Sequence, residues 1–336
     1  MNFLRDPKRY FVLIQACLSF AANAEPAGSS VASPLPDLPL TTVSADSQTV
    51  KGRDGWYFLS TEIEHLLTAQ NQIPQVADSE AVIEIRKYAD ALKAIGIKLV
   101  LMPIPEKSVI RMDGLVDATA LPEANGYSRA TRAYLNELTK NDIDVIDLYD
   151  KLSQSSDPIY CKTDSHFTPK TAARISGHII KHIAERFPEV PIQSPSADPE
   201  SQASVSQITI KGDLAGNEVE ETLELHAAPE CATSVNRLGT ITNSPILLMG
   251  DSHLLVYNQG DDMHATGAGI VDHLTQALGY SPDVISNKGD GIKAPRNKLH
   301  RDLKKNPDFL KDKKLIIWCF AARNFSQQQW NEVKLR

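Results

Sequence analysis

The sequence is poor in cysteine, in positive charge and in long apolar runs. Its four cysteines leave no multi-cysteine zinc signature. A formal net charge of −7 argues against a nucleic-acid binder, although it is compatible with a local basic groove for an anionic polymer. No segment beyond the N-terminus reaches the roughly 20 apolar residues that span a bilayer. With 42% hydrophobic residues, the chain is expected to be a globular protein with a substantial core.

The N-terminus carries the pattern of a secretory signal. Arg5, Lys8 and Arg9 precede the short apolar stretch "YFVLIQACLSFAANA", and its closing Ala-Asn-Ala supplies the small residues that a signal peptidase recognises. We therefore expect residues 1–24 to be a signal peptide that directs the chain to the periplasm. An uncleaved membrane anchor is the alternative, because the boundaries of such stretches are soft.

Removal of the signal changes the cysteine content. Loss of Cys17 leaves Cys161, Cys231 and Cys319, which is an odd number in an oxidising compartment. The simplest expectation is one disulfide and one buried thiol, and the sequence does not assign the pair.

Composition divides the mature chain into a linker and one domain. Residues 25–48 are rich in Ala, Ser, Pro and Thr, which is typical of a linker. Residues 49–336 alternate between helical and strand patterns. Apolar residues spaced by three and four predict a helix over 79–95 that Ser79 caps, and "IKLVLMP" follows Gly96 as a buried strand.

The same alternation continues to the C-terminus, apart from residues 188–245, which show little periodicity. Strands separated by helices predict an α/β fold with a parallel sheet flanked by helices. In such sheets the reactive groups lie at the carboxyl ends of the strands. The further elements expected are helices near 127–140, 169–187 and 267–279, and strands at "DVIDL", 246–249, "DVIS" and "LIIWCF".

The segment "ILLMGDSHLL" places Ser252 where an apolar strand meets a turn. Gly250 permits a tight turn, and "HLLVY" is expected to begin a helix, which would expose the Ser252 hydroxyl above the sheet. The main-chain N–H of Ser252 would then point toward a developing oxyanion. The alternative is that Ser252 is only an N-cap. Asp251 and His253 are expected to form local hydrogen bonds.

A second segment, "YCKTDSHFTPKTA", supplies partners for such a serine. Asp164 and His166 are two residues apart, and in an extended segment such residues face the same side. Asp164 is then expected to bind one ring nitrogen of His166 and to leave the other for Ser252. These three residues form the predicted catalytic triad, and the alternative is a polar loop with a capping aspartate.

A metal site is the competing hypothesis. His178 and His182 are four apart on a predicted helix, and Asp261, Asp262 and His264 cluster later in the chain. The sequence "HIIKH" lacks the glutamate found inside zinc-protease helices. A surface helical pair is therefore favoured, and no metal or other cofactor is expected.

Other polar residues lie near expected strand ends. Lys107 closes "PIPEK", which follows a buried strand. Asn287 and Lys288 belong to "NKGDG", whose glycines permit close approach of the backbone, and Asn287 is a candidate donor to an oxyanion. Together with Arg296, the two lysines are candidates to bind an anionic substrate. Solvated side chains in simple loops are the alternative.

The segments "KGRDGWYFL", "PIPEK", "TDSHFTPKTA", "GDSH" and "LIIWCFAARNFS" occur in this order over roughly residues 50–330. In this they resemble the AlgJ/AlgX-like alginate O-acetyltransferase family. The resemblance implies an SGNH-hydrolase-like fold in which the Asp-x-His pair precedes the serine. It also implies Ser252 as nucleophile, His166 as base and Asp164 as the partner that orients the base.

The resemblance further implies a periplasmic enzyme that acetylates an exported, alginate-like polysaccharide, with a membrane-bound O-acyltransferase partner supplying the acetyl groups. Two departures bear on this expectation. Phe167 stands where the family usually has tryptophan, and Asp251 stands where it often has threonine. Ordinary SGNH esterases carry aspartate at the second position. A polysaccharide acetylesterase and a non-catalytic polysaccharide-binding subunit of an export complex therefore stay open as alternatives.

Overall fold

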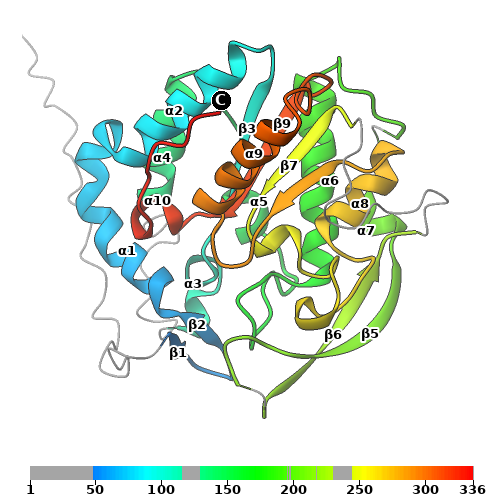
Figure 1. Cartoon of the computed structure of the whole chain (residues 1–336). Coiled ribbons are helices and arrows are strands. Elements are labelled where there is room, and N and C mark those ends of the chain that lie inside the picture. Colours follow the sequence, from blue (N-terminus) through cyan, green and yellow to red (C-terminus); the bar gives the residue numbers. More distant parts are fainter. Residues whose placement is uncertain are drawn as a thin grey trace, which may run out of the picture. The chain divides into compact units, whose positions relative to one another are not determined.

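A five-stranded parallel sheet forms the centre of the described part of the protein (Figure 1). The structure is a computed structural model that describes residues 48–115, 129–194, 196, 198–216, 218–229 and 244–335. The strand order is β4-β3-β9-β7-β8, and every neighbouring pair is parallel. The strands are β3 (Lys98–Ile104), β4 (Asp144–Val145), β7 (Ile246–Gly250), β8 (Asp283–Ser286) and β9 (Leu315–Ala321).

Helices cover both faces of the sheet, and each face has its own apolar core (Figure 1). Successive side chains of β9 alternate between the two cores, so that Ile317 enters one and Trp318 the other. This two-sided burial explains the continuous apolar runs of the central strands and confirms the predicted α/β class. One core is covered by α6 (Pro169–Arg186) and α8 (Ile270–Leu278), and the other by α2 (Glu80–Lys93), α4 (Arg129–Lys140) and α9 (Lys293–Lys305).

Capping residues set the ends of the predicted helices. The Ser79 hydroxyl accepts a hydrogen bond from the N–H of Val82 at 3.3 Å and caps α2, and Gly96, with a φ of +80°, follows the end of this helix. Thr168 caps α6 in the same way, with Pro169 in the first turn. The predicted helices are confirmed as α2, α4, α6 and α8.

The segment without clear periodicity contains an antiparallel hairpin of β5 (Ser204–Lys211) and β6 (Glu220–Ala227). Most side chains of β5 are exposed, so the apolar alternation that signals a half-buried strand is missing there. The apolar periodicity of α9 is weak for a different reason, because the buried face of this helix includes Arg296 as well as Leu299 and Leu303.

Apart from α1, the remaining elements are short. Among the described residues no helix has both the length and the hydropathy needed to cross a membrane. These elements are β1 (Thr49–Lys51), β2 (Tyr57–Leu59), α1 (Ser60–Gln72), α3 (Lys107–Ile110), α5 (Tyr149–Ser153), α7 (Pro199–Gln202), α10 (Asn324–Gln327) and the 3-10 helices η2 (Ile73–Asp78), η3 (Met112–Gly114), η5 (Ser252–Leu254) and η6 (Asp261–Met263).

The predicted signal at residues 1–24, nearly all of the linker at 25–48, Cys17 and Cys231 lie outside the described residues. Cys161 and Cys319 are both buried free thiols. The expected disulfide is therefore not formed between these two. Burial raises the pKa of both thiols well above the usual value, which keeps them protonated and unreactive.

Candidate active site

Ser252 lies just beyond the carboxyl end of β7, in the one-turn 3-10 helix η5. The turn is tight because Gly250 packs against β9, where an added Cβ would lie 2.1 Å from the carbonyl oxygen of Cys319. The carboxylate of Asp251 caps η5 by accepting a hydrogen bond from the N–H of His253 at 3.1 Å. Asp251 is thus the cap and Ser252 is not, and the longer helix expected after Ser252 is replaced by this single turn.

The loop before α6 brings a histidine and an aspartate to this serine. Oδ1 of Asp164 accepts hydrogen bonds from the main-chain N–H of His166 at 2.9 Å and from its Nδ1 at 2.6 Å. The pair meets through an Asx-type turn and not through the extended segment that the spacing suggested. Nε2 of His166 lies 2.8 Å from Oγ of Ser252. Because a carboxylate only accepts, Nδ1 carries the ring proton, and Nε2 accepts the serine hydroxyl.

Asp164 and His166 shift each other's pKa in opposite directions. Burial by itself would raise the pKa of Asp164, but the imidazoles of His166 and His264 hold it well below the usual range. Burial by itself would lower the pKa of His166, but Asp164 outweighs it and raises that pKa above the ordinary 6.5. Asp164 is therefore ionised at neutral pH, as the orienting member of a triad must be.

His264 is a second imidazole on the same carboxylate. Its Nε2 lies 2.8 Å from Oδ2 of Asp164, and the N–H of Asp213 donates to the same oxygen at 3.0 Å. The sequence suggested His264 only as a member of an acidic cluster for metal binding. Because Asp164 lies 100 positions earlier in the chain, no local sequence pattern signals this contact. His264 has a φ of 71°, a left-handed conformation that a non-glycine residue adopts only where the fold requires it.

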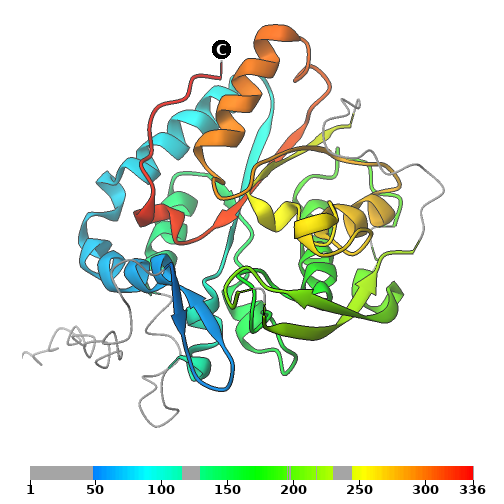
Figure 2. The same cartoon turned by 60° about the horizontal axis from the view of Figure 1, so that its bottom comes forward.

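The β5–β6 hairpin holds the loop that carries Asp164 and His166 (Figure 2). The Glu221 carboxylate accepts from the N–H groups of Lys162 at 2.8 Å and Thr163 at 2.9 Å. The Asp213 carboxylate accepts from the N–H and the hydroxyl of Ser165 at 2.7 and 2.6 Å. Carboxylates of the hairpin thus accept hydrogen bonds from main-chain N–H groups of the loop. These bonds fix the position of Asp164 and His166.

Comparison with known proteins identifies the family of the chain. A family model described as an SGNH hydrolase-like domain, acetyltransferase AlgX, matches residues 49–322. The chain belongs to this family. Comparison with curated proteins finds no match. The expected family and its SGNH-hydrolase-like fold are confirmed.

Similar solved structures have the same fold at low sequence identity. The O-acetyltransferase domain of Pseudomonas putida AlgJ is 17% identical, with a TM-score of 0.57, and the match covers 84% of this chain and 94% of that one. Pseudomonas aeruginosa AlgX is 19% identical, with a TM-score of 0.53 and coverage of 83% and 67%. Bacillus cereus PatB1 with a sulfonyl adduct is 14% identical, with a TM-score of 0.52 and coverage of 87% and 100%.

In this member of the AlgX family, Lys107 lies under the triad loop and not in contact with solvent. Its Nζ donates to the carbonyl oxygens of Lys162 at 3.0 Å and Asp164 at 2.9 Å. It also lies over the rings of Trp56 and Phe58, 5.3 and 5.4 Å from their centroids. Burial lowers the pKa of Lys107 to about 8. The structure therefore assigns Lys107 to holding the loop, in place of the substrate contact that the sequence suggested.

The side chains of the other predicted substrate-binding residues make no hydrogen bond with the triad, although the main-chain N–H of Asn287 donates to the carbonyl oxygen of Gly250, at the end of β7, at 3.1 Å. Arg296 is on the buried face of α9, where its guanidinium lies over the rings of Trp318 and Trp330, 5.4 and 5.5 Å from their centroids. Lys288 is ion-paired with Asp262 at 2.6 Å on the surface. The side-chain amide of Asn287 donates to the carbonyl of Lys288 at 2.8 Å and so is not directed at an oxyanion above Ser252.

The metal hypothesis finds little support in the described residues. Their one group with ligand atoms close enough for a metal is Asp164, His166 and Asp213. Those atoms are already joined in the hydrogen bonds of the triad and of Ser165. His178 and His182 are not grouped with a third ligand, and burial lowers the pKa of His178 to about 4. We therefore interpret Asp164, His166 and Asp213 as part of the hydrogen-bond network of the triad and not as a metal site.

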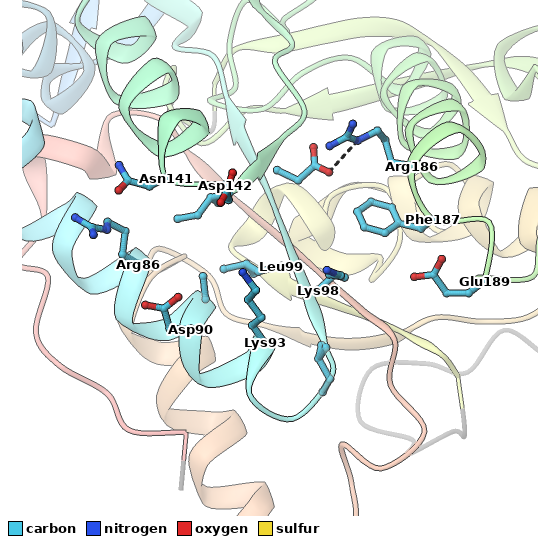
Figure 3. Close-up of a pocket in the computed structure, with 14 residues that line it drawn as sticks. Arg86, Asp90, Lys93, Lys98, Leu99, Asn141, Asp142, Arg186, Phe187 and Glu189 are labelled. Carbon is cyan, nitrogen blue, oxygen red and sulfur yellow. Dashed lines mark hydrogen bonds and ion pairs between the residues drawn. The ribbon is translucent and has the colours of Figure 1, made fainter.

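A groove of about 560 Å³ lies at the other end of the sheet (Figure 3). It is bounded by α2, the start of β3 at Lys98, and the end of α6 at Arg186. Its lining includes both basic and acidic side chains, and Nε of Arg186 lies 3.2 Å from Oδ2 of Asp144. Since the carboxyl end of β7 is opposite, this groove has no part in the chemistry of Ser252.

Arg323 is a residue of the site's edge that sequence patterns did not single out. It is the second residue after β9, whose carboxyl end lies beside that of β7. Its Nη1 lies 3.5 Å from Oε1 of Glu62, and its side chain is 22% exposed. After burial, its positive charge is among the causes that lower the pKa of His253. A guanidinium at this edge is suited to bind a carboxylate.

Proposed function

We propose that this protein is an O-acetyltransferase that acetylates hydroxyl groups of an exported polysaccharide through an acetyl-serine intermediate. The observation that carries the proposal is the chain of contacts from Ser252 to His166 at 2.8 Å and from His166 to Asp164 at 2.6 Å. A serine hydroxyl is a weak nucleophile until a base within hydrogen-bond distance accepts its proton. The AlgX-family match gives the direction of the chemistry, which is acetyl transfer.

In the first half-reaction, Oγ of Ser252 attacks the acetyl carbonyl carbon of the donor, and its proton moves to Nε2 of His166. The bond from that carbon to the leaving group then breaks, and His166 returns the proton to the leaving group. Ionised Asp164 stabilises the imidazolium formed in between. The N–H of Ser252 heads a short 3-10 helix, so it has no acceptor within that helix and is positioned to stabilise the oxyanion.

In the second half-reaction, a sugar hydroxyl attacks the acetyl carbon of acetyl-Ser252 and gives its proton to His166. The bond between the acetyl carbon and Oγ breaks, and Oγ takes the proton back. The product is a sugar O-acetyl ester and free enzyme. Water in place of the sugar would make the same site an esterase.

The polymer, the compartment and the partner belong to the proposal, and the family match and the sequence pattern support them. We propose an alginate-like, uronate-containing acceptor in the periplasm, with Arg323 as the residue that binds its carboxylate. The acetyl donor is a membrane-bound O-acyltransferase partner that delivers acetyl groups across the inner membrane. The predicted signal at residues 1–24 supports export of the chain.

The test is acetyl release from a chromogenic acetyl ester by wild-type protein and Ser252→Ala, with and without uronate oligomers. Transferase function predicts that label from the ester appears on the oligomer and that both release and transfer vanish in the variant. Serine-dependent release with no label on the oligomer would instead assign an esterase. Equal release by both proteins would remove the triad and favour a polysaccharide-binding subunit.

The pH dependence of acylation should follow His166. Only the neutral ring accepts the serine proton, so the rate rises with pH as the ring loses its proton. Because Asp164 raises the pKa of His166, we expect the midpoint to lie above the ordinary histidine value of about 6.5. In Asp164→Asn the plateau should fall by about 10⁴-fold and the midpoint should move to lower pH.

Single-turnover acylation rates between pH 5 and 9 would measure both quantities. Asp312→Asn, which changes an exposed aspartate before β9, is the control and should keep the wild-type midpoint. A wild-type midpoint below that of free histidine, or an unmoved midpoint in Asp164→Asn, would contradict the assigned pair.

A further inference from the structure

The residues directly before and after Ser252 form a second aspartate–histidine pair. Nδ1 of His253 lies 2.7 Å from Oδ1 of Asp251. The other carboxylate oxygen, Oδ2, accepts a hydrogen bond from the N–H of Ala321 at 2.8 Å. The ring of His253 lies edge-on to that of His166, with centroids 5.2 Å apart. The base His166 therefore has a second imidazole beside it, and each of the two rings is held by its own carboxylate.

The contacts define the chemical state of His253. Asp251 is ionised, because His253 and main-chain donors outweigh burial and lower its pKa to about 2. Burial lowers the pKa of His253 and outweighs the effect of Asp251, so the ring is neutral at neutral pH. With Nδ1–H donating to Asp251, Nε2 carries a lone pair and can only accept.

This lone pair is not used by the described part of the chain. Nε2 of His253 has no hydrogen-bond partner among those residues and is not one of their fully buried unpaired atoms, so a ligand can reach it although the side chain is only 7% exposed. An acceptor on such a largely buried ring gains more from a bound O–H donor than one in bulk water does. Nε2 of His166 becomes free in the same way once Ser252 is acetylated and no longer donates to it. The acetyl-enzyme thus presents two neighbouring imidazole acceptors.

We infer that His253 is an acceptor-binding residue that selects sugars with two neighbouring hydroxyl groups. The attacking hydroxyl donates to His166 and loses its proton there, as the proposed function requires. The adjacent hydroxyl donates to Nε2 of His253 and keeps its proton. A bound vicinal diol satisfies both imidazoles, whereas a sugar lacking one hydroxyl leaves an acceptor unpaired, and such unpaired groups give strong discrimination.

The experiment uses methyl β-D-mannuronate and its 2-deoxy and 3-deoxy analogues as acceptors, with a chromogenic acetyl ester as donor. The variants are His253→Phe, which removes the acceptor, and Asp251→Asn. In Asp251→Asn the amide can donate to Nδ1, which moves the ring proton to Nε2 and turns that atom into a donor. His178→Phe, on α6 and outside the site, is the matched control. Thermal unfolding of each variant reports whether the fold is kept.

We expect wild-type kcat/KM for the diol to exceed that for either deoxy analogue by about tenfold or more. Both site variants should lose this preference, chiefly through kcat/KM for the diol, and in His253→Phe the burst of serine acetylation should change by less than about threefold. His178→Phe should keep the wild-type preference.

A diol preference that survives in both folded variants would overturn this inference and leave the proposed function standing. An equal loss of burst and transfer in His253→Phe would also overturn it, because His253 would then act by positioning Ser252. Absence of acetyl-serine in the wild type would overturn the proposed function, and this inference with it.

Discussion

Replacing His166 by alanine should abolish acetyl transfer almost as completely as replacing Ser252. Nε2 of His166 is 2.8 Å from Oγ of Ser252, and no other described side chain is within hydrogen-bond distance of this hydroxyl. Without the base the hydroxyl stays protonated and unreactive. We expect each single variant to lose about 10⁴- to 10⁶-fold in kcat, and the double variant to lose no more, because the residues act as a unit.

Acetyl release and label transfer, measured for both single variants and the double variant, would check this result. Residual activity common to all three would report the contribution of binding and oxyanion stabilisation alone. His65→Ala is an unsuitable control because the His65 ring contacts the buried carboxylate of Glu106. His300 is half-buried and belongs to neither apolar core, so His300→Ala is the control. If the double variant lost the sum of the free-energy losses of the two single variants, the residues would not act in a shared step. Near-normal turnover by His166→Ala would refute its assignment as the base.

The second large effect is expected from Gly212→Ala, at the start of the turn between β5 and β6. An added Cβ there would lie 2.1 Å from the carbonyl oxygen of Thr163 and 2.5 Å from its Oγ1. Since the obstacle is backbone, the hairpin must move away from the loop that carries Asp164. Misplacement of the triad by about 1 Å costs about 10²-fold in rate, and the overpacking costs about 1–3 kcal/mol of unfolding free energy.

Denaturant unfolding together with acylation rates would measure both effects. Gly177→Ala is the matched control: it lies in α6, its added Cβ would meet Pro199 at an ordinary 3.4 Å, and alanine is a better helix former by about 1 kcal/mol. It should therefore keep full activity and unfold at equal or higher denaturant. Full activity in Gly212→Ala would show that the hairpin does not determine where Asp164 lies.

Much of the fold follows from patterns along the chain. The apolar run before Ser252, the capping serine of α2 and the Thr-Pro start of α6 each have a local physical cause, and each agrees with the structure. The β5–β6 hairpin does not, because strands with exposed side chains lack the alternation on which prediction depends. Its role in holding the loop at Thr163 depends on contacts between segments far apart in the sequence.

The sequence by itself determined which residues have the chemistry of a triad, because Asp164, His166 and Ser252 lie in segments with strong local patterns and a family resemblance. Tertiary structure alone decided how they meet and what surrounds them. Packing under the loop turned Lys107 from a candidate substrate contact into a structural cation. It placed His264 on Asp164 from 100 residues away. Burial and hydrogen-bond partners belong to neighbours in space, and a linear pattern records neighbours only along the chain.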